Sequence, residues 1–262
     1  MPSRLQSSLA LSSDGARWIV VNASPDLTTQ IGRHLPATDT ENLLRASPVS
    51  HVFLTNADLD HSLGLLLLRE GGCLAVTAPD GARDALTHGL RFDAALQTFG
   101  GLAWNPVSED WTPIANSGLE VRAIPLPDAE PPRYAPEARG LHGVGYLFRE
   151  GRDGTVCGIF PDLARLDESL LDILASCTHV YLDGTFWDED EMPRLGLSPR
   201  GAREMGHLPV SDSLVLLSRR GIRAAYLHVN NTNPILRPDS EERRKLEQSG
   251  LRLAEDGERL SL

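Results

Sequence analysis

The sequence predicts an α/β fold, because short apolar runs alternate with segments of helical periodicity along most of the chain. Four of these apolar runs end, within a few residues, on a carboxylate or an imidazole. Each run is closed by turn-forming residues, as expected of a short buried strand. If the four strands lie side by side, the polar side chains that follow them meet at the carboxyl ends of the strands, where open sheets bind ligands. The runs are residues 17–21, 51–54, 179–182 and 222–227.

The N-terminal half is expected to begin with a hairpin and then to alternate strands with helices. The turn signal Ser13-Asp14-Gly15 joins the first two strands, and a helix starts near Asp26. The expected strands cover residues 7–11, 18–22, 51–54 and a short stretch near Ala75, and the further expected helices cover 62–69 and 79–88.

The second half continues this alternation after a segment that is harder to assign. Residues 125–139 contain five prolines and are expected to form a surface loop near the site. No break in composition divides the chain, so a single domain over residues 1–262 is expected. The expected strands cover 119–124, 143–149 and 155–160, and the expected helices cover 169–175, 211–219 and 240–249.

Composition and charge exclude several classes of protein. The 36 acidic and 25 basic residues give a net charge of -11, which repels a polyanion, so no nucleic-acid partner is expected. Cys73, Cys157 and Cys177 form no CxxC pair, so we expect no disulfide framework and no cysteine zinc site. The chain shows no apolar signal core, and its longest apolar run is too short to span a membrane. These features predict a soluble protein of the reducing cytoplasm.

The segment after the second of the four strands carries three potential metal ligands. Asp58, Asp60 and His61 fall within four residues. Oxygen and nitrogen ligands of this kind suit zinc, iron or manganese better than a thiophilic ion. The alternative is structural, with Asp58 or Asp60 capping the helix that follows, because acidic residues stabilise the positive end of a helix.

Asp183 and His228 follow the third and fourth strands and complete the predicted site. The neighbouring Gly184 allows close approach of the backbone to an ion, although an Asp-Gly turn also has a purely structural explanation. A histidine that closes a strand is commonly just half-buried. Together, however, two histidines and one or more carboxylates form the set that binds non-haem iron with open positions. The combination predicts a metal site.

Other polar residues near these strands are candidates for further roles. His207 can act as a general acid or base, and the alternative is an exposed loop histidine. The amides after His228 can bind a substrate or support the ligands, and they are equally suited to turns. The predicted substrate-binding or supporting residues are Asp26, Asn56, Asp58, Asn230, Asn231 and Asn233.

Several of these segments resemble the metallo-β-lactamase superfamily and, within it, the PqqB family of pyrroloquinoline quinone (PQQ) biosynthesis. Residues 55–61 stand where the superfamily carries its HxHxDH motif. Residues 22–26, 183–185, 205–207 and 228–236 are similar to the corresponding signatures of PqqB. The resemblance extends from about Arg4 to the C-terminus and implies an αββα sandwich with the site at one edge.

The resemblance also implies a ligand set. In the superfamily one metal uses the first two histidines of HxHxDH and a later third. Here the first two positions are Asn56 and Asp58, and residues 124–127, where the third is expected, contain no histidine. The other metal position is implied to be complete, which favours one metal over two-metal hydrolysis. Its implied ligands are Asp60, His61, Asp183 and His228.

PqqB proteins are associated with iron-dependent hydroxylation of the tyrosine-derived PQQ precursor. The resemblance therefore implies a mononuclear Fe(II) oxygenase, with Zn(II) as the alternative metal and His207 as acid/base or substrate anchor. Two other functions stay open: a carrier that takes PQQ or its precursor to the periplasm, and a metal-dependent hydrolase of an ester or phosphodiester. The usual family N-terminal strand, glycine-rich turn and cysteine-bearing zinc segment are expected to be absent from this chain.

Overall fold

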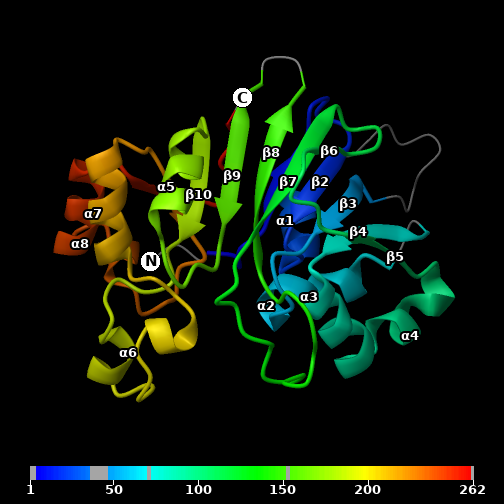
Figure 1. Cartoon of the computed structure of the whole chain (residues 1–262), viewed down its shortest axis with the longest axis horizontal. Helices are drawn as coiled ribbons and strands as arrows, with labels where there is room; N and C mark the ends of the chain where they lie inside the picture. The colour runs from blue at the N-terminus through cyan, green and yellow to red at the C-terminus, as the bar shows by residue number, and fades with distance from the viewer. Residues whose placement is uncertain (1–3, 36–46, 70–71, 152–153, 261–262) are drawn as a thin grey trace. The chain divides into compact units, whose positions relative to one another are not determined.

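The computed structural model describes residues 4–35, 47–69, 72–151 and 154–260 (Figure 1). The chain divides into two compact units. The N-terminal unit spans Leu5–Asp153, and the C-terminal unit spans Gly154–Leu262 together with Met1–Arg4. Both units combine strands with helices, which confirms the predicted α/β class. The single domain over residues 1–262 stays a prediction.

The first sheet of the N-terminal unit has five strands. β1 pairs antiparallel with β2, as the predicted hairpin requires, and β2 to β5 then run parallel to one another. Three further strands of this unit, β6 to β8, pair antiparallel. The strands are β1 (Leu9–Leu11), β2 (Trp18–Val21), β3 (Val49–Phe53), β4 (Leu74–Ala78), β5 (Leu102–Pro106), β6 (Thr112–Pro113), β7 (Leu119–Pro125) and β8 (Val144–Glu150).

Both faces of the five-stranded sheet are covered, because successive side chains of a strand point to opposite faces. Val52 of β3 belongs to a buried cluster that also contains Leu27 of the first helix. Its neighbour Phe53 points the other way and lies edge-on to Tyr146 and Phe148 of β8, with ring centroids 5.4 and 5.3 Å away. Helices therefore cover one face of this sheet, and β8 covers the other.

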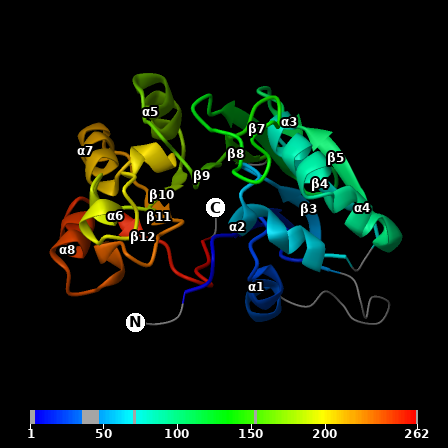
Figure 2. The same ribbon diagram turned by 90° about the horizontal axis from the view of Figure 1, so that it is seen from below.

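Short helices follow the strands of the N-terminal unit (Figure 2). In the described part of the chain, no helix has the length and apolar character needed to cross a membrane. The helices are α1 (Leu27–His34), α2 (Leu59–Ser62), α3 (Asp80–Asp84) and α4 (Phe92–Leu96), with the short helical turns η1 (Leu63–Leu67), η2 (Ala85–Gly89) and η3 (Gln97–Phe99).

The helix expected over residues 62–69 begins earlier than predicted. α2 starts at Leu59, and the 3-10 turn η1 replaces an α-helix from Leu63 onward. The Ser62 hydroxyl donates a 2.8 Å hydrogen bond to the Asp58 carbonyl, which closes the first turn around that residue. Asp60 and His61 consequently lie on the first turn of a helix and not in the loop before it.

The proline-rich segment connects β7 to β8 without a helix or strand over residues 126–143, so the loop predicted for 125–139 begins one residue later, because Pro125 closes β7. The Tyr134 hydroxyl donates a 2.5 Å hydrogen bond to the carbonyl oxygen of Ala57. The loop therefore reaches the turn that carries Asn56 and Asp58.

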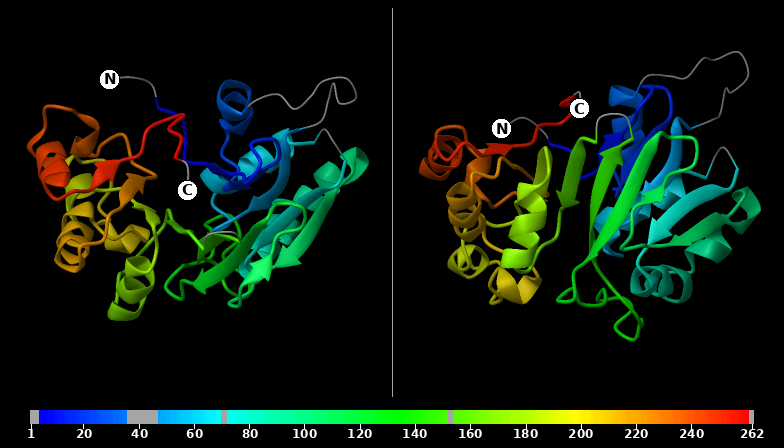
Figure 3. Two further views of the ribbon diagram at one scale, coloured as in Figure 1. Left: turned by 90° about the horizontal axis from the view of Figure 1, so that it is seen from above. Right: turned by 45° about the horizontal axis from the view of Figure 1, so that its top comes forward.

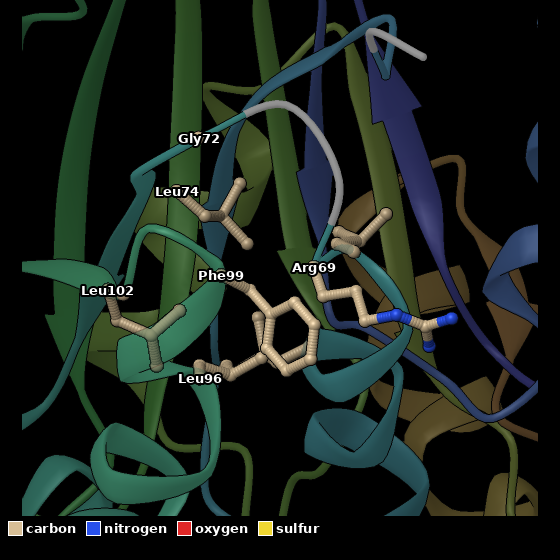
Figure 4. Close-up of a pocket in the computed structure, with 9 residues that line it drawn as sticks. Arg69, Gly72, Leu74, Leu96, Phe99 and Leu102 are labelled. Carbon is tan, nitrogen blue, oxygen red and sulfur yellow. The ribbon is translucent and has the colours of Figure 1, made fainter.

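A small apolar hollow lies beside η1, β4 and β5 (Figure 4). Leu74, Leu96 and Leu102 line it, and the guanidinium of Arg69 stands 5.8 Å from the ring centroid of Phe99. None of the predicted site residues lines this hollow, so it plays no part in the predicted chemistry.

The C-terminal unit contains a parallel sheet of four strands (Figure 3). β10 lies between β9 and β11, and β12 flanks β11. The Tyr226 and Ser213 hydroxyls, 2.8 Å apart, fasten α7 to β11. The elements are β9 (Val156–Phe160), α5 (Glu168–Ala175), β10 (His179–Asp183), α6 (Glu191–Arg194), η4 (Arg203–Met205), α7 (Val210–Arg220), β11 (Ala225–Leu227), η5 (Pro234–Leu236), α8 (Glu241–Gln248) and β12 (Arg252–Leu253).

The four strands that precede the predicted site residues lie in two sheets and not side by side in one. β2 and β3 are parallel neighbours in the N-terminal unit, and β10 and β11 are parallel neighbours in the C-terminal unit. Asp60 and His61 thus follow a strand of the first pair, whereas Asp183 and His228 follow the second pair. Each pair brings its polar side chains to the carboxyl edge of its own sheet.

Candidate metal centre

Backbone hydrogen bonds fasten α2 to the turn that follows β2. The Ala23 N–H donates to the His61 carbonyl at 2.7 Å, and the Gly64 N–H donates to the Ala23 carbonyl at 2.8 Å. A Cβ atom at Gly64 would stand only 2.3 Å from the carbonyl oxygen of Ser24. This close approach requires glycine and places His61 against the β2 turn.

His61 is fully buried, and the Asn56 amide oxygen sets its tautomer. His61 Nδ1 lies 2.9 Å from Asn56 Oδ1, which also accepts the Asp58 N–H at 3.0 Å. Because an amide oxygen only accepts, Nδ1 carries the proton and Nε2 is the nitrogen suited to bind a metal. His61 Nε2 lies 3.9 Å from Asp60 Oδ2, so the two predicted ligands present their donor atoms together.

Two buried residues that the sequence analysis did not single out support this histidine. The Thr55 N–H donates to Asn22 Oδ1 at 2.9 Å, and the Asn22 amide donates to the Thr55 hydroxyl at 2.9 Å. That hydroxyl stands 3.3 Å from His61 Nδ1. Asn22 itself adopts a left-handed conformation with φ of 61°, which asparagine tolerates better than most residues.

Of the other predicted supporting residues in this unit, Asp26 stands at the N-cap of α1. Its carboxylate accepts the backbone N–H of Gln6 at 2.8 Å. Asp58 stands at the N-cap of α2, and its carboxylate accepts from the Asn56 amide at 3.2 Å. Asp58 thus occupies the N-cap position of α2, but its carboxylate faces Asn56 and makes no capping hydrogen bond to the helix.

In the C-terminal unit, the buried carboxylate of Asp183 accepts four hydrogen bonds. Its Oδ1 accepts from the Thr185 N–H at 2.9 Å and the Thr185 hydroxyl at 2.6 Å. Its Oδ2 accepts from the Leu163 N–H at 3.0 Å and from His207 Nδ1 at 2.8 Å. Each carboxylate oxygen thus already receives two donors, which matches its capacity.

Asp183 and His207 favour the carboxylate and imidazolium forms of each other. Burial by itself raises the pKa of Asp183, but the charge and hydrogen bond of His207 outweigh burial and hold the pKa below its usual range. Burial likewise disfavours a charged His207, yet the carboxylates of Asp183 and then Asp162 outweigh it and raise the pKa of His207 above its ordinary value. The His207 ring is therefore largely buried and fixed by its hydrogen bond to Asp183, and it is not an exposed loop histidine.

Asp162, which the sequence analysis did not single out, stands between the two histidines of this unit. Its Oδ1 lies 3.5 Å from His228 Nδ1 and 3.7 Å from His207 Nδ1. Potential ligand atoms of these three side chains all lie within 4.8 Å of one another. Asp162 comes two residues after β9, so the signal that identified Asp183, a carboxylate just after an apolar strand, was present here too.

His228 is held from the β10 turn in an unusual backbone conformation. Its φ is 56°, a left-handed value that is costly for a non-glycine residue. The Thr185 hydroxyl lies 2.9 Å from both the carbonyl oxygen and Nδ1 of His228. Since the Thr185 proton is directed to Asp183, the contact with Nδ1 leaves Nε2 of His228 as the nitrogen able to bind a metal.

The asparagines after His228 have distinct positions. The buried Asn233 donates from Nδ2 to the Gly184 carbonyl at 2.8 Å and fastens the loop to the β10 turn. Asn230 donates from its backbone to the Thr185 carbonyl at 3.1 Å. Asn231 is exposed, so its amide is the one that solvent-borne molecules reach.

The fold and these side chains define a class of protein. Residues 17–228 match the family model of the β-lactamase superfamily domain, and the chain is a member of that superfamily with the metallo-β-lactamase fold. The predicted fold class is therefore confirmed. A diphosphatase from the PhnP family shares this fold, with a TM-score of 0.67 at 16% identity over 98% of this chain and 85% of the other.

Within the superfamily, the chain belongs to the PqqB family. It is 37% identical over 272 residues to coenzyme PQQ synthesis protein B of Pseudomonas fluorescens, which covers 99% of this chain and 88% of the relative. The crystal structure of Zn(2+)-bound PqqB from Methylobacterium extorquens superposes with a TM-score of 0.80 at 31% identity, over 98% of this chain and 86% of that one. The resemblance drawn from the sequence is confirmed.

Proposed function

We propose that this protein acts in PQQ biosynthesis as a metal-dependent oxygenase that hydroxylates a tyrosine-derived PQQ precursor. The pathway is supported by a relative named for PQQ synthesis that is 37% identical over almost the whole chain. The observation that carries the chemistry is that potential ligand atoms of Asp162, His207 and His228 lie within 4.8 Å of one another, which supports a pair of metal ligands, Asp162 and His228, beside the potential acid/base His207. Imidazoles combined with a carboxylate form the donor set of non-haem Fe(II) sites.

The donor atoms fit a divalent metal, and we propose Fe(II), with Zn(II) as the alternative. In the C-terminal unit we assign Asp162 and His228 as ligands. Asp183 is less suited than Asp162, because each of its oxygens already accepts two hydrogen bonds. Asp60 and His61 stay predicted ligands, on the basis of their motif and of donor atoms 3.9 Å apart. A bound Fe(II) with open positions supplies binding places for dioxygen and substrate.

His207 is the proposed catalytic residue. Its Nδ1 proton is directed to Asp183, which fixes the tautomer and stabilises the protonated ring. The other ring nitrogen can then give a proton to, or take one from, a phenolic substrate. Asp183 is a positioning residue in this scheme, and the exposed Asn231 is the proposed amide contact to the substrate.

Oxygen uptake with the tyrosine-derived precursor tests this function. We expect anaerobically prepared, Fe(II)-loaded protein, supplied with a two-electron reductant such as ascorbate, to consume oxygen only when the precursor is added. One oxygen atom should enter the hydroxylated product, and the other should leave as water. His207→Gln should keep the metal and lose turnover, whereas Asp162→Ala should lose both. Hydrolysis of an ester or phosphodiester under strictly anaerobic conditions would instead support the hydrolase, and tight PQQ binding without turnover would support the carrier.

A further inference from the structure

We propose that Glu191 is a positioning residue for His228, holding the loop of residues 228–233 in the conformation that presents this histidine. Glu191 lies at the start of α6 and is 1% exposed. Its carboxylate accepts from the Thr232 hydroxyl at 2.5 Å and from the Trp187 N–H at 2.7 Å. Burial raises the pKa of this carboxyl, so its place inside the unit is costly.

A chain of hydrogen bonds connects Glu191 to His228. The Thr232 hydroxyl, which donates to Glu191, accepts from the Asn230 amide at 2.9 Å. The Asn230 N–H donates to the Thr185 carbonyl at 3.1 Å. The Thr185 hydroxyl then lies 2.9 Å from Nδ1 and from the carbonyl oxygen of His228. The buried carboxylate thus acts on the histidine through the loop and does not touch the reacting groups.

The backbone of His228 explains why such a support is needed. A left-handed residue other than glycine persists only where its surroundings hold it, and φ of His228 is 56°. One side of the loop is held from the β10 turn, where the Gly184 N–H donates to the Leu227 carbonyl at 2.8 Å and Asn233 donates to the Gly184 carbonyl. Glu191 holds the other side through Thr232. Side chains that orient a ligand histidine typically change metal affinity when they are removed.

Two substitutions remove this support with little change in volume. Thr232→Val removes the hydroxyl that links Glu191 to Asn230, and Glu191→Gln replaces one acceptor oxygen by an NH2 group. Ser249→Ala is the control, because the Ser249 hydroxyl donates only within α8 and its end, to the Lys245 carbonyl at 2.9 Å. The first readout is hydrogen exchange of the backbone N–H of Asn230 in metal-free protein. The second is the Kd of the full chain for Zn(II).

We expect the backbone N–H of Asn230 to exchange about 10-fold faster in both variants than in wild type, and the Kd for Zn(II) to rise by about 10-fold or more. The double variant should bind Zn(II) no more weakly than the weaker-binding single variant, because the side chains of Glu191 and Thr232 act through the same hydrogen bond. Wild-type exchange and wild-type Kd in folded variants would overturn the proposal. The inference on ligation rests on the proposed function. If wild-type protein binds neither Fe(II) nor Zn(II), that function fails, while the exchange rate still decides the role of Glu191.

Discussion

Asp183 and His207 form a buried ion pair in the C-terminal unit, with His207 Nδ1 2.8 Å from Asp183 Oδ2. Its two pKa values move apart, that of Asp183 downward and that of His207 upward, because each side chain stabilises the charged form of the other. The pair gives His207 a fixed tautomer and a protonated state that an exposed histidine would lose more easily. Stability should therefore depend on pH through these two groups.

For metal-free protein we predict that His207→Gln lowers the free energy of unfolding by about 3 kcal/mol at pH 6, and by less at pH 9. The folded-state pKa of His207 is raised above its ordinary 6.5, so its contribution is complete below that value and disappears as the pH rises through the raised pKa. The Asp183 contribution is present above the ordinary carboxyl pKa and disappears as the pH falls through the lowered one. Urea unfolding at both pH values measures this, and a larger difference at pH 9 would contradict it.

A second prediction concerns Asn56, whose amide oxygen fixes the tautomer of His61. Asn56→Ala should weaken metal binding by about 10-fold to 100-fold, because the ring is no longer held with Nε2 available. Isothermal titration of the metal measures the change. Asn105→Ala is a suitable control, since the exposed Asn105 amide donates to the Ala103 carbonyl at 3.3 Å and to no other group of the described residues. Equal affinities in the two variants would refute the role of Asn56.

The sequence alone names most of these residues as candidates, because apolar runs and the turn formers after them predict where strands end. It did not identify Asp162, although this aspartate also follows a strand, because a single Pro-Asp pair is typical of an ordinary turn. What distinguishes Asp162 is its distance to His207 and His228. That distance depends on loops of different strands, which no local pattern encodes.

Helix α2 shows how a tertiary contact displaces a boundary set by local pattern. The apolar run after His61 predicts a helix over residues 62–69, yet the α-helix covers Leu59–Ser62. The hydrogen bonds that join Ala23 to His61 and to Gly64 draw this helix start against the β2 turn. The presence of a helix after β3 was predictable from the apolar pattern, whereas its first and last residues depend on these tertiary hydrogen bonds.

Gly64, which lies in η1 directly after α2, provides a test of the contact between this helix and the β2 turn. Gly64→Ala should lower the free energy of unfolding by about 3 kcal/mol, because a Cβ would meet the Ser24 carbonyl oxygen at 2.3 Å and displace α2 from the β2 turn. Gly32→Ala in α1 is the matched control, since a Cβ there meets nothing within 4 Å and should stabilise the helix by about 0.5–1 kcal/mol. Chemical unfolding of both variants tests the contrast, and equal effects would argue against the close approach.

For the molecule as a whole, periodicity identified strands but not the sheets that contain them. The four strands that precede the predicted site residues form two parallel pairs, one in each compact unit, because pairing depends on contacts distant in sequence. Periodicity predicted the α/β class, and family resemblance supplied the αββα arrangement that periodicity left open. The fold does not determine which substrate and which metal the protein binds, because a few side chains of the site decide both.

Metal binding should stabilise the folded chain. At a free metal concentration of about 100 times Kd, the free energy of unfolding should rise by about 2.7 kcal/mol, and chelation should reverse the rise. His228→Ala should abolish the response. Thermal unfolding with and without metal measures it, and an unchanged transition in wild-type protein would mean that the metal does not bind the native state selectively.

The most direct test is the metal content of protein purified anaerobically, measured for wild type and for His228→Ala. We predict about one iron per wild-type chain and its loss from the variant, because an imidazole and carboxylate set of this kind binds a single non-haem ion. Wild-type protein that takes up no metal under these conditions, or a variant that retains it fully, would contradict the assignment of this site.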